Sequence, residues 1–141
     1  MVDTSLRRLP WTPPPDPLPE GERARRVPGP IYDLATVQHL AHGGPIYLAS
    51  DRCEKNVEAL EWDTDDIAKF IAALRPNDYR NSEWCQGRSR KVIDADVYAI
   101  HYDHIAACRS VPWRHPQYYL KFGFRHDDPR LTVWVMSCHL S

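Results

Sequence analysis

Hydrophobic and polar positions alternate most regularly near the C-terminus, where they predict a β-hairpin. Residues 117–124 place an apolar side chain at every second position, which is the period of a strand with one buried face. Residues 131–139 are rich in β-branched and aromatic side chains, which are typical of a central strand. Residues 126–130 lie between these arms and supply Asp and Pro, which favour a turn.

A second alternating segment, residues 90–102, predicts one long strand or two short ones. Its even-numbered positions from 96 to 102 and its odd-numbered positions from 97 to 101 are expected on opposite faces of the sheet. Residues 77–89 are polar and lack a clear period, so we expect a connector there. Residues 103–115 predict a loop with a basic, aromatic tip.

Earlier in the chain the apolar period changes to that of amphipathic helices. The first predicted helix follows an N-cap at Asp33 and stops at a Gly-Gly pair; the second follows Ser50, and the third covers residues 62–75. The acidic residues that open the third helix suit the positive end of its dipole better than a metal site. Cys53 lies on the apolar face of the second helix, so we expect a core residue there rather than a reactive thiol.

Residues 1–30 differ from the rest of the chain, because they contain eight of the thirteen prolines and five arginines. Proline fixes φ and lacks an amide donor, so this segment is unsuited to a sheet interior or a continuous helix. We expect an extended, polyproline-like or disordered arm. Two roles stay open for it: a partner-docking arm anchored by Trp11, or a tail without a function of its own.

The order of the elements, helices first and strands afterwards, predicts an α+β fold in which N-terminal helices pack on one face of a C-terminal antiparallel β-sheet. At 141 residues the chain is long enough for one domain with its own core. We therefore predict two regions, a Pro-rich arm at residues 1–30 and an α+β domain at residues 31–141.

Composition indicates an ordinary globular protein, with 43% hydrophobic and 26% charged residues. No apolar run reaches the ~18 residues of a membrane span, and the N-terminus lacks the apolar region of a signal peptide. We therefore expect a cytoplasmic protein with no membrane partner. In that compartment its four cysteines, which form no C-x-x-C pair, are expected to be reduced.

Charge is divided unevenly along the chain. Residues 31–79 contain four basic and nine acidic side chains (net −5), whereas residues 80–125 contain eight basic and four acidic ones (net +4). A basic half suits a polyanionic ligand. Such a division also arises by chance in a short chain, so charge alone does not decide the function.

Motifs of the common enzyme classes are missing from the sequence. It has no Gly-rich phosphate loop, no nucleophile elbow and no H-E-x-x-H, so nucleotide hydrolysis and the common hydrolase mechanisms have no support. Cys138 and His139 are neighbours on a predicted strand and therefore point to opposite faces, which is a poor arrangement for a thiol–imidazole pair.

The side chains that remain are cations and proton-transfer groups, which suit metal-free cleavage of RNA. A base removes the 2′-hydroxyl proton, cations hold the phosphate charge, and an acid protonates the departing 5′-oxygen. Histidine is acid or base near neutral pH, with an unperturbed pKa of ~6.5, arginine holds phosphate, and exposed aromatics stack unpaired bases. The candidates are Arg80, Arg88, Arg90, Lys91, Tyr119, Lys121 and His139, with Trp113 and Arg114 in the predicted loop.

The order and spacing of several short motifs resemble the MqsR-like toxins of bacterial type II toxin–antitoxin systems, over about residues 31–141. The shared pattern consists of the capped helix at residues 32–44, the helix at residues 67–74 that ends in Leu74-x-x-x-Asp78-Tyr79, the triplets Asp96-Val97-Tyr98 and Tyr119-Leu120-Lys121, and a closing strand with Ser137. The Pro-rich arm lies outside the resemblance.

The resemblance implies a RelE-like α+β fold and a metal-independent endoribonuclease that acts on messenger RNA, free or on the ribosome. It implies no cofactor, and it implies a cognate antitoxin protein as partner. Tyr119 matches a functional tyrosine of the family, Arg80 matches a functional lysine after a one-residue gap, and His139 replaces a second lysine. Ala95 stands where the family has a glutamine. Under this hypothesis Arg80 and Lys121 neutralise phosphate, while His139 and Tyr119 share the acid–base work.

Two alternatives stay open. A protein derived from a toxin-like fold can bind RNA or a protein through its arm and aromatic loop without cleaving RNA, and the missing glutamine favours this alternative. The other is a zinc-stabilised nucleic-acid-binding domain, because ligand-type residues occur close together at His101, His104 and Cys108, with Cys85 or His115 as a fourth.

Overall fold

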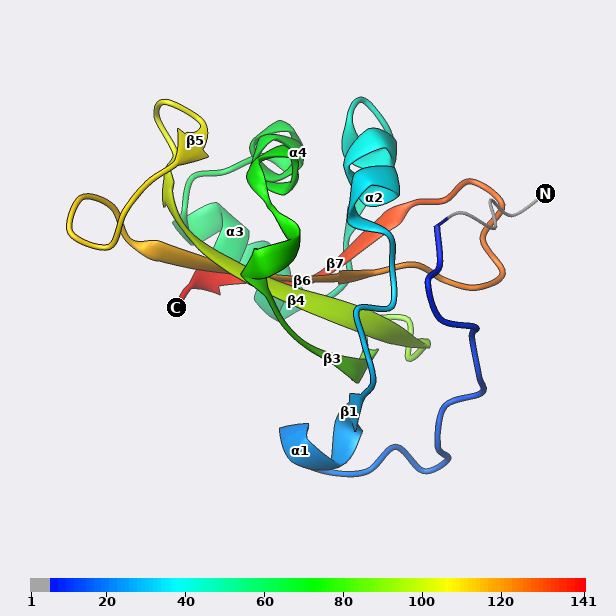
Figure 1. Ribbon diagram of the computed structural model, residues 1–141. Helices are drawn as coiled ribbons and strands as arrows, with labels where there is room; N and C mark the ends of the chain where they lie inside the picture. The colour runs from blue at the N-terminus through cyan, green and yellow to red at the C-terminus, as the bar shows by residue number, and fades with distance from the viewer. Residues whose placement is uncertain (1–5) are drawn as a thin grey trace.

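The computed structural model describes residues 6–141, which fold into a mixed, mostly antiparallel sheet of seven strands with four α-helices (Figure 1). The α+β prediction is confirmed at this level. The helices are α1 (Glu22–Arg25), α2 (Leu34–Ala41), α3 (Asp51–Ala59) and α4 (Thr64–Ala73), with a 3-10 turn, η1, at Pro76–Asp78. The strands are β1 (Arg26–Val27), β2 (Ile46–Leu48), β3 (Tyr79–Gln86), β4 (Val92–Asp103), β5 (Cys108–Arg109), β6 (Gln117–Gly123) and β7 (Val133–Leu140).

The strands follow the order β1-β3-β4-β6-β7-β2, and β5 pairs with one end of β4. Every pairing is antiparallel except that of β2 with β7, which is parallel. The prediction of a purely antiparallel sheet is therefore wrong at this edge. A long stretch of chain separates β2 from β7, so no tight hairpin imposes an antiparallel arrangement on the pair.

The predicted C-terminal hairpin is confirmed as β6 and β7, in which Tyr119 pairs with His139. The predicted segment 90–102 is one continuous strand, β4. The predicted connector at residues 77–89 is wrong, because eight of its residues form β3 and pair with β4. The sequence of this strand lacks an alternation of apolar and polar residues, because Ser82 and Glu83 are both buried polar residues and point to opposite faces of the sheet.

Helices α2 and α4 cover one face of the sheet, above it in Figure 1, and enclose the main core. The predicted helix starts are confirmed by their caps. Asp33 accepts a hydrogen bond from the Thr36 amide, Ser50 accepts one from the Cys53 amide, and the acidic start of α4 forms a reciprocal capping box. Asp63 and Asp66 are therefore occupied as caps, as expected, whereas Asp65 forms an ion pair with Lys69.

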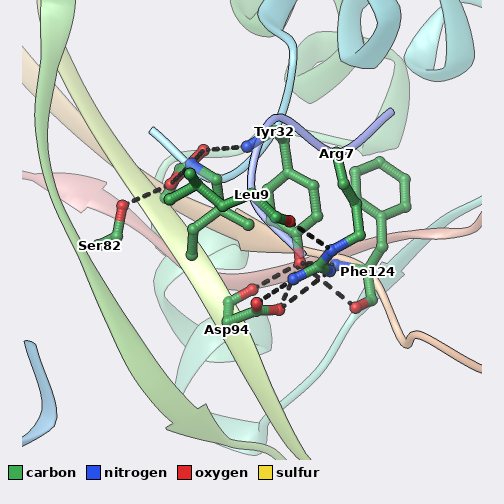
Figure 2. A network of polar contacts seen from close by, with 8 residues as sticks. Arg7, Leu9, Tyr32, Ser82, Asp94 and Phe124 are labelled. Atoms are coloured by element: carbon green, nitrogen blue, oxygen red, sulfur yellow. Dashed lines mark hydrogen bonds and ion pairs between the residues drawn. The ribbon is translucent and has the colours of Figure 1, made fainter. Parts of the chain in front are cut away.

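The N-terminal segment, as far as the structure describes it, is attached to the sheet through a buried polar network (Figure 2). The Arg7 guanidinium forms an ion pair with Asp94, and the Tyr32 hydroxyl donates to the Asp94 carboxylate at 2.8 Å. The carboxylate of Asp96 accepts hydrogen bonds from the Ile31 and Tyr32 amides and from the Ser82 hydroxyl. These contacts fix the point where the Pro-rich segment joins the domain.

Further along the arm, β1 adds two residues to the outer edge of β3, opposite Ser82 and Glu83. An edge position is compatible with a Pro-rich neighbourhood, because only one side of the strand has to form hydrogen bonds. Trp11 stacks on His126 with ring centroids 3.7 Å apart. Its ring therefore has an intramolecular contact on the loop between β6 and β7.

The four cysteines are free thiols, and Cys53, Cys85 and Cys138 are buried. Burial raises the pKa of Cys53 to about 11 and those of Cys85 and Cys138 to about 12. The prediction of Cys53 as a core residue is confirmed. Across residues 6–141, no helix is both long enough and apolar enough to span a membrane.

Candidate functional site

A groove lies on the face of the sheet that α2 and α4 leave uncovered. It consists of two adjoining cavities of about 290 and 480 Å³, which share Glu22, Lys121, Met136 and Ser137. The smaller cavity, here the histidine end, also contains Tyr119, His139, Ser50, Arg52, Cys53 and Asn56. The larger cavity, here the glutamate end, also contains Glu20, Gly21, Arg25, Glu83, Trp84, Cys85 and Gln86. The strands β3, β6 and β7 supply the floor.

Tyr119 and His139 form a stacked pair at the histidine end. They are direct cross-strand partners on β6 and β7, and their rings are 5.4 Å apart and 15° from parallel. His139 Nδ1 lies 2.7 Å from the carbonyl oxygen of Leu140. A carbonyl oxygen only accepts, so Nδ1 carries the proton and Nε2 of the neutral ring holds the free lone pair. The pair thus presents one proton acceptor and one hydroxyl donor.

Lys121 occupies the boundary between the two ends and forms an ion pair with Glu83. Their side chains are only 15% and 7% exposed. Burial alone would lower the pKa of Lys121, but the neighbouring Cys85 and the hydrogen bond and charge of Glu83 raise it above its usual value. Lys121 is therefore a fixed cation in the groove, partly neutralised by a carboxylate that the sequence interpretation missed.

The position at which the resemblance calls for a glutamine lies on the same face of the sheet. Ala95 is fully buried in β4, with Glu83 opposite it on β3 and Gly123 opposite it on β6. Its methyl group belongs to a small apolar cluster with Cys85, Ile93, Trp134 and Met136. Glu83 thus supplies a polar group directly opposite the position at which the resemblance calls for a glutamine.

Three of the four predicted catalytic residues come together in the groove: Tyr119, Lys121 and His139. Arg80 is exposed at the start of β3, where the register with β4 shifts, and it is not among the described residues that line either cavity. Arg52 of α3, which the sequence interpretation did not single out, does line the histidine end.

Neither protein-family models, nor curated proteins, nor solved structures gave a match to this chain. The interpretation of the groove therefore rests on its own geometry. The combination of a proton acceptor, a hydroxyl donor and two cations on neighbouring elements suits acid–base chemistry on a phosphate ester.

The predicted RNA-binding residues fall into two groups at opposite ends of β4. Arg88, Arg90 and Lys91 lie in the turn between β3 and β4, whereas Trp113 and Arg114 are exposed in the loop before β6. Twelve residues of extended strand at ~3.3 Å each separate the two groups by roughly 40 Å, so one short RNA segment cannot contact both together with the groove.

The Arg88 side chain forms several contacts with other residues of the protein. Its guanidinium forms ion pairs with Asp51 and Glu54 of α3 at 3.0 Å each, and donates to the Tyr47 hydroxyl at 3.1 Å. Its backbone amide donates to the carbonyl of Ala49 at 2.6 Å. These contacts join the tip of the β3–β4 hairpin to the start of α3, which is a structural role.

We expect Arg88→Ala to lower the melting temperature by a few degrees, because it releases the hairpin tip from α3. Arg90→Ala is the matched control, since the exposed Arg90 lies in the same turn and its side chain makes no hydrogen bond or ion pair to any residue in 6–141. Thermal unfolding followed by circular dichroism measures both. Equal melting temperatures for the two variants would show that the contacts of Arg88 with α3 and Tyr47 contribute nothing to stability.

The residues of the zinc alternative have other partners. His101 Nδ1 donates to the carbonyl of His115 at 2.9 Å, and His104 lies 3.4 Å from Asp66. Cys85 is in the groove, on a different strand from either histidine. Within residues 6–141, no group of three or more His, Cys, Asp or Glu side chains is arranged to hold a metal ion.

Proposed function

We propose that this protein is a metal-independent endoribonuclease and that the groove is its active site. One observation carries the proposal: Tyr119 and His139 stack beside Lys121 on two adjacent strands, and all three line one cavity. Sites on strands hold their side chains precisely, and precise placement is what acid–base catalysis requires. The order of motifs that resembles the MqsR-like toxins adds independent support.

The proposed reaction is a transesterification within RNA. His139 Nε2 removes the proton from a ribose 2′-hydroxyl, and the freed oxygen attacks the adjacent phosphorus. The bond from phosphorus to the 5′-oxygen breaks, and the Tyr119 hydroxyl gives its proton to that oxygen. The products are a 2′,3′-cyclic phosphate and a 5′-hydroxyl. Lys121 and Arg52 neutralise the charge that collects on the phosphate oxygens.

We propose messenger RNA as the substrate, the cytoplasm as the location and a cognate antitoxin as the protein partner, with a RelE-like arrangement of the domain. Support for these finer points comes from the sequence resemblance. The experiment is to incubate the purified protein with a long messenger RNA, with and without ribosomes, and to map the new ends. Discrete ends that carry a 2′,3′-cyclic phosphate are expected, and intact RNA in both mixtures would overturn the proposal.

Binding without cleavage is the second candidate function, and two observations favour it. Glu83 partly neutralises the buried cation of the groove, which weakens its pull on a phosphate. Trp113 is 82% exposed and Ile105 is 92% exposed, so two loops present apolar side chains to solvent. The RNA mixtures above separate the candidates, because a binding protein leaves the RNA whole.

We expect Arg52→Ala to slow RNA cleavage about tenfold, because Arg52 lines the histidine end and supplies phosphate charge there. Arg80→Ala is the comparison at the position that the resemblance indicates. It should change the rate less than twofold, because Arg80 lies outside the lining of the groove as described. Initial rates on a fluorogenic RNA measure both variants. A larger loss of cleavage rate in Arg80→Ala than in Arg52→Ala would show that Arg80, and not Arg52, neutralises the phosphate.

A further inference from the structure

Residues 20–25, the segment that contains α1, form a roof over the groove. Glu20, Gly21, Glu22 and Arg25 line the glutamate end, and Glu22 also lines the histidine end. In Figure 1, α1 lies next to the edge strand β1, on the side of the sheet opposite to α2 and α4. The groove that contains Lys121 is thus covered by a segment from the Pro-rich arm.

This roof is weakly attached. None of the residues of α1 is buried. Beyond α1 the chain is held by β1, whose pairing is limited to Arg26 with Glu83 and Val27 with Ser82. The hydrogen bond from Arg25 Nε to the Pro19 carbonyl, at 2.6 Å, stays within the arm and does not bind it to the sheet. Few buried contacts and a short ladder favour local opening.

The backbone also provides a bending point at the start of the roof. Gly21 has a φ of 87°, which favours glycine, and a Cβ there would meet no described atom within 4 Å. The position is therefore restricted by backbone conformation and not by packing. A rotation at Gly21 can move the roof without disturbing the core.

Residues 20–25 contain two glutamates and two arginines, so the roof has no net charge, and its effect on a phosphate depends on which side chains line the groove. Glu20 and Glu22 line the groove, and their carboxylates form no ion pair with any residue in 6–141. A carboxylate near Lys121 occupies the kind of position that an RNA phosphate requires. We propose that residues 20–25 are a lid whose two glutamates compete with RNA phosphate for the groove and that opens to admit RNA. This inference rests on the proposed function and assigns it an autoinhibitory device.

The test measures RNA affinity in a His139→Ala background, in which the substrate stays intact. The lid variant is Glu20→Gln with Glu22→Gln. The control is Glu58→Gln with Glu61→Gln, which removes the same charge from exposed positions at the end of α3 and beyond it. Fluorescence anisotropy with an unstructured RNA at low salt gives the Kd. The lid variant should bind about fivefold more tightly, and the control should stay within twofold of the parent.

A second measurement follows the lid directly in the full-length His139→Ala protein, in which the RNA again stays intact. Trypsin cuts after arginine, and Arg23 is exposed in α1. Saturating RNA should speed trypsin cleavage after Arg23 several-fold, because the opened lid can enter the active site of the protease more readily than the closed lid. Gly21→Ala, which strains the backbone of the closed lid, should speed the same cleavage without RNA.

The outcomes separate the two proposals. If the parent, lid variant and control bind RNA equally and RNA does not speed trypsin cleavage, the lid is overturned and the endoribonuclease proposal stands. If the RNA affinity of the control rises as much as that of the lid variant, net charge explains the effect and the lid is again overturned. If none of the three proteins binds RNA, the endoribonuclease proposal is overturned, together with the lid that depends on it.

Discussion

His139→Ala is expected to reduce RNA cleavage about 10³-fold, the usual size of an acid–base contribution. The hydrogen bond from Nδ1 to the Leu140 carbonyl leaves Nε2 as the free proton acceptor of the neutral ring, and alanine has no acceptor. RNA affinity should change little, because the cations of the groove remain. Single-turnover cleavage of an end-labelled RNA gives the rate, and anisotropy gives the Kd.

The matched control is His39→Ala, because His39 is exposed on α2, the helix that packs on the other face of the sheet. It should cleave RNA at the rate of the parent. A His139→Ala protein that cleaves within threefold of the parent would remove His139 from the mechanism. A similar loss of activity in both variants would point to a general effect on folding, and would equally remove the assignment.

The parts of the fold that follow a hydrophobic period could be predicted from the sequence. The capped helices are of this kind, because Asp33 and Ser50 are N-caps that mark where helices start. The C-terminal hairpin is another example, because every second residue from Tyr118 to Phe124 faces the core. The hairpin in turn places Tyr119 opposite His139. The local sequence pattern was therefore enough to bring Tyr119 and His139 together.

The rest depends on contacts between distant segments. The polar strand β3 has no hydrophobic alternation, because Glu83 is buried against Lys121 and Ser82 against Asp96. A sequence pattern does not reveal that a buried polar side chain has found a partner elsewhere in the chain. Glu83 was missed for that reason. A possible signal was the alternation of Asn81, Glu83 and Cys85 in a chain that already predicted a neighbouring strand.

The cation that faces the histidine end could not be chosen from spacing alone. The resemblance indicated Arg80, whereas the cavity is lined by Arg52, which comes from a helix that packs beside β7. Both arginines are exposed, so only the tertiary arrangement distinguishes them. The parallel pairing of β2 with β7 leads directly into α3 and sets the position of Arg52.

Asp96 shows how a motif residue can be essential without touching the groove. The Asp-Val-Tyr triplet was part of the resemblance, but the Asp96 side chain is on the helical face, fully buried, with three hydrogen-bond donors aimed at it. It thereby joins Ile31 and Tyr32, which directly follow the Pro-rich arm, to Ser82 of β3. The same strand contributes Ala95 to the opposite face. Its role is to align the two layers beneath the groove.

Asp96→Ala is accordingly expected to lower the free energy of unfolding by roughly 3 kcal/mol, because two buried amides and one hydroxyl lose their acceptor. Part of that loss is offset, since burial raises the pKa of Asp96 and the variant no longer buries a charge. Urea denaturation followed by tryptophan fluorescence measures the change. The slope against urea should stay constant if the variant only loses stability.

Two comparison variants make this expectation specific. Ser82→Ala removes one of the three donors and leaves the acceptor satisfied by two amides, so we expect a loss of only about 1 kcal/mol. Asp65→Ala removes an exposed carboxylate of α4 whose ion pair with Lys69 spans one helical turn, and its midpoint should move little. If Asp96→Ala unfolded at the same urea concentration as Asp65→Ala, the hydrogen bonds of Asp96 would not be what holds this part of the chain to the sheet. The arm would then have to be held by its other contacts, namely β1, the Trp11–His126 stack and the Arg7–Asp94 ion pair, and the position of the lid above Lys121 would depend on these contacts.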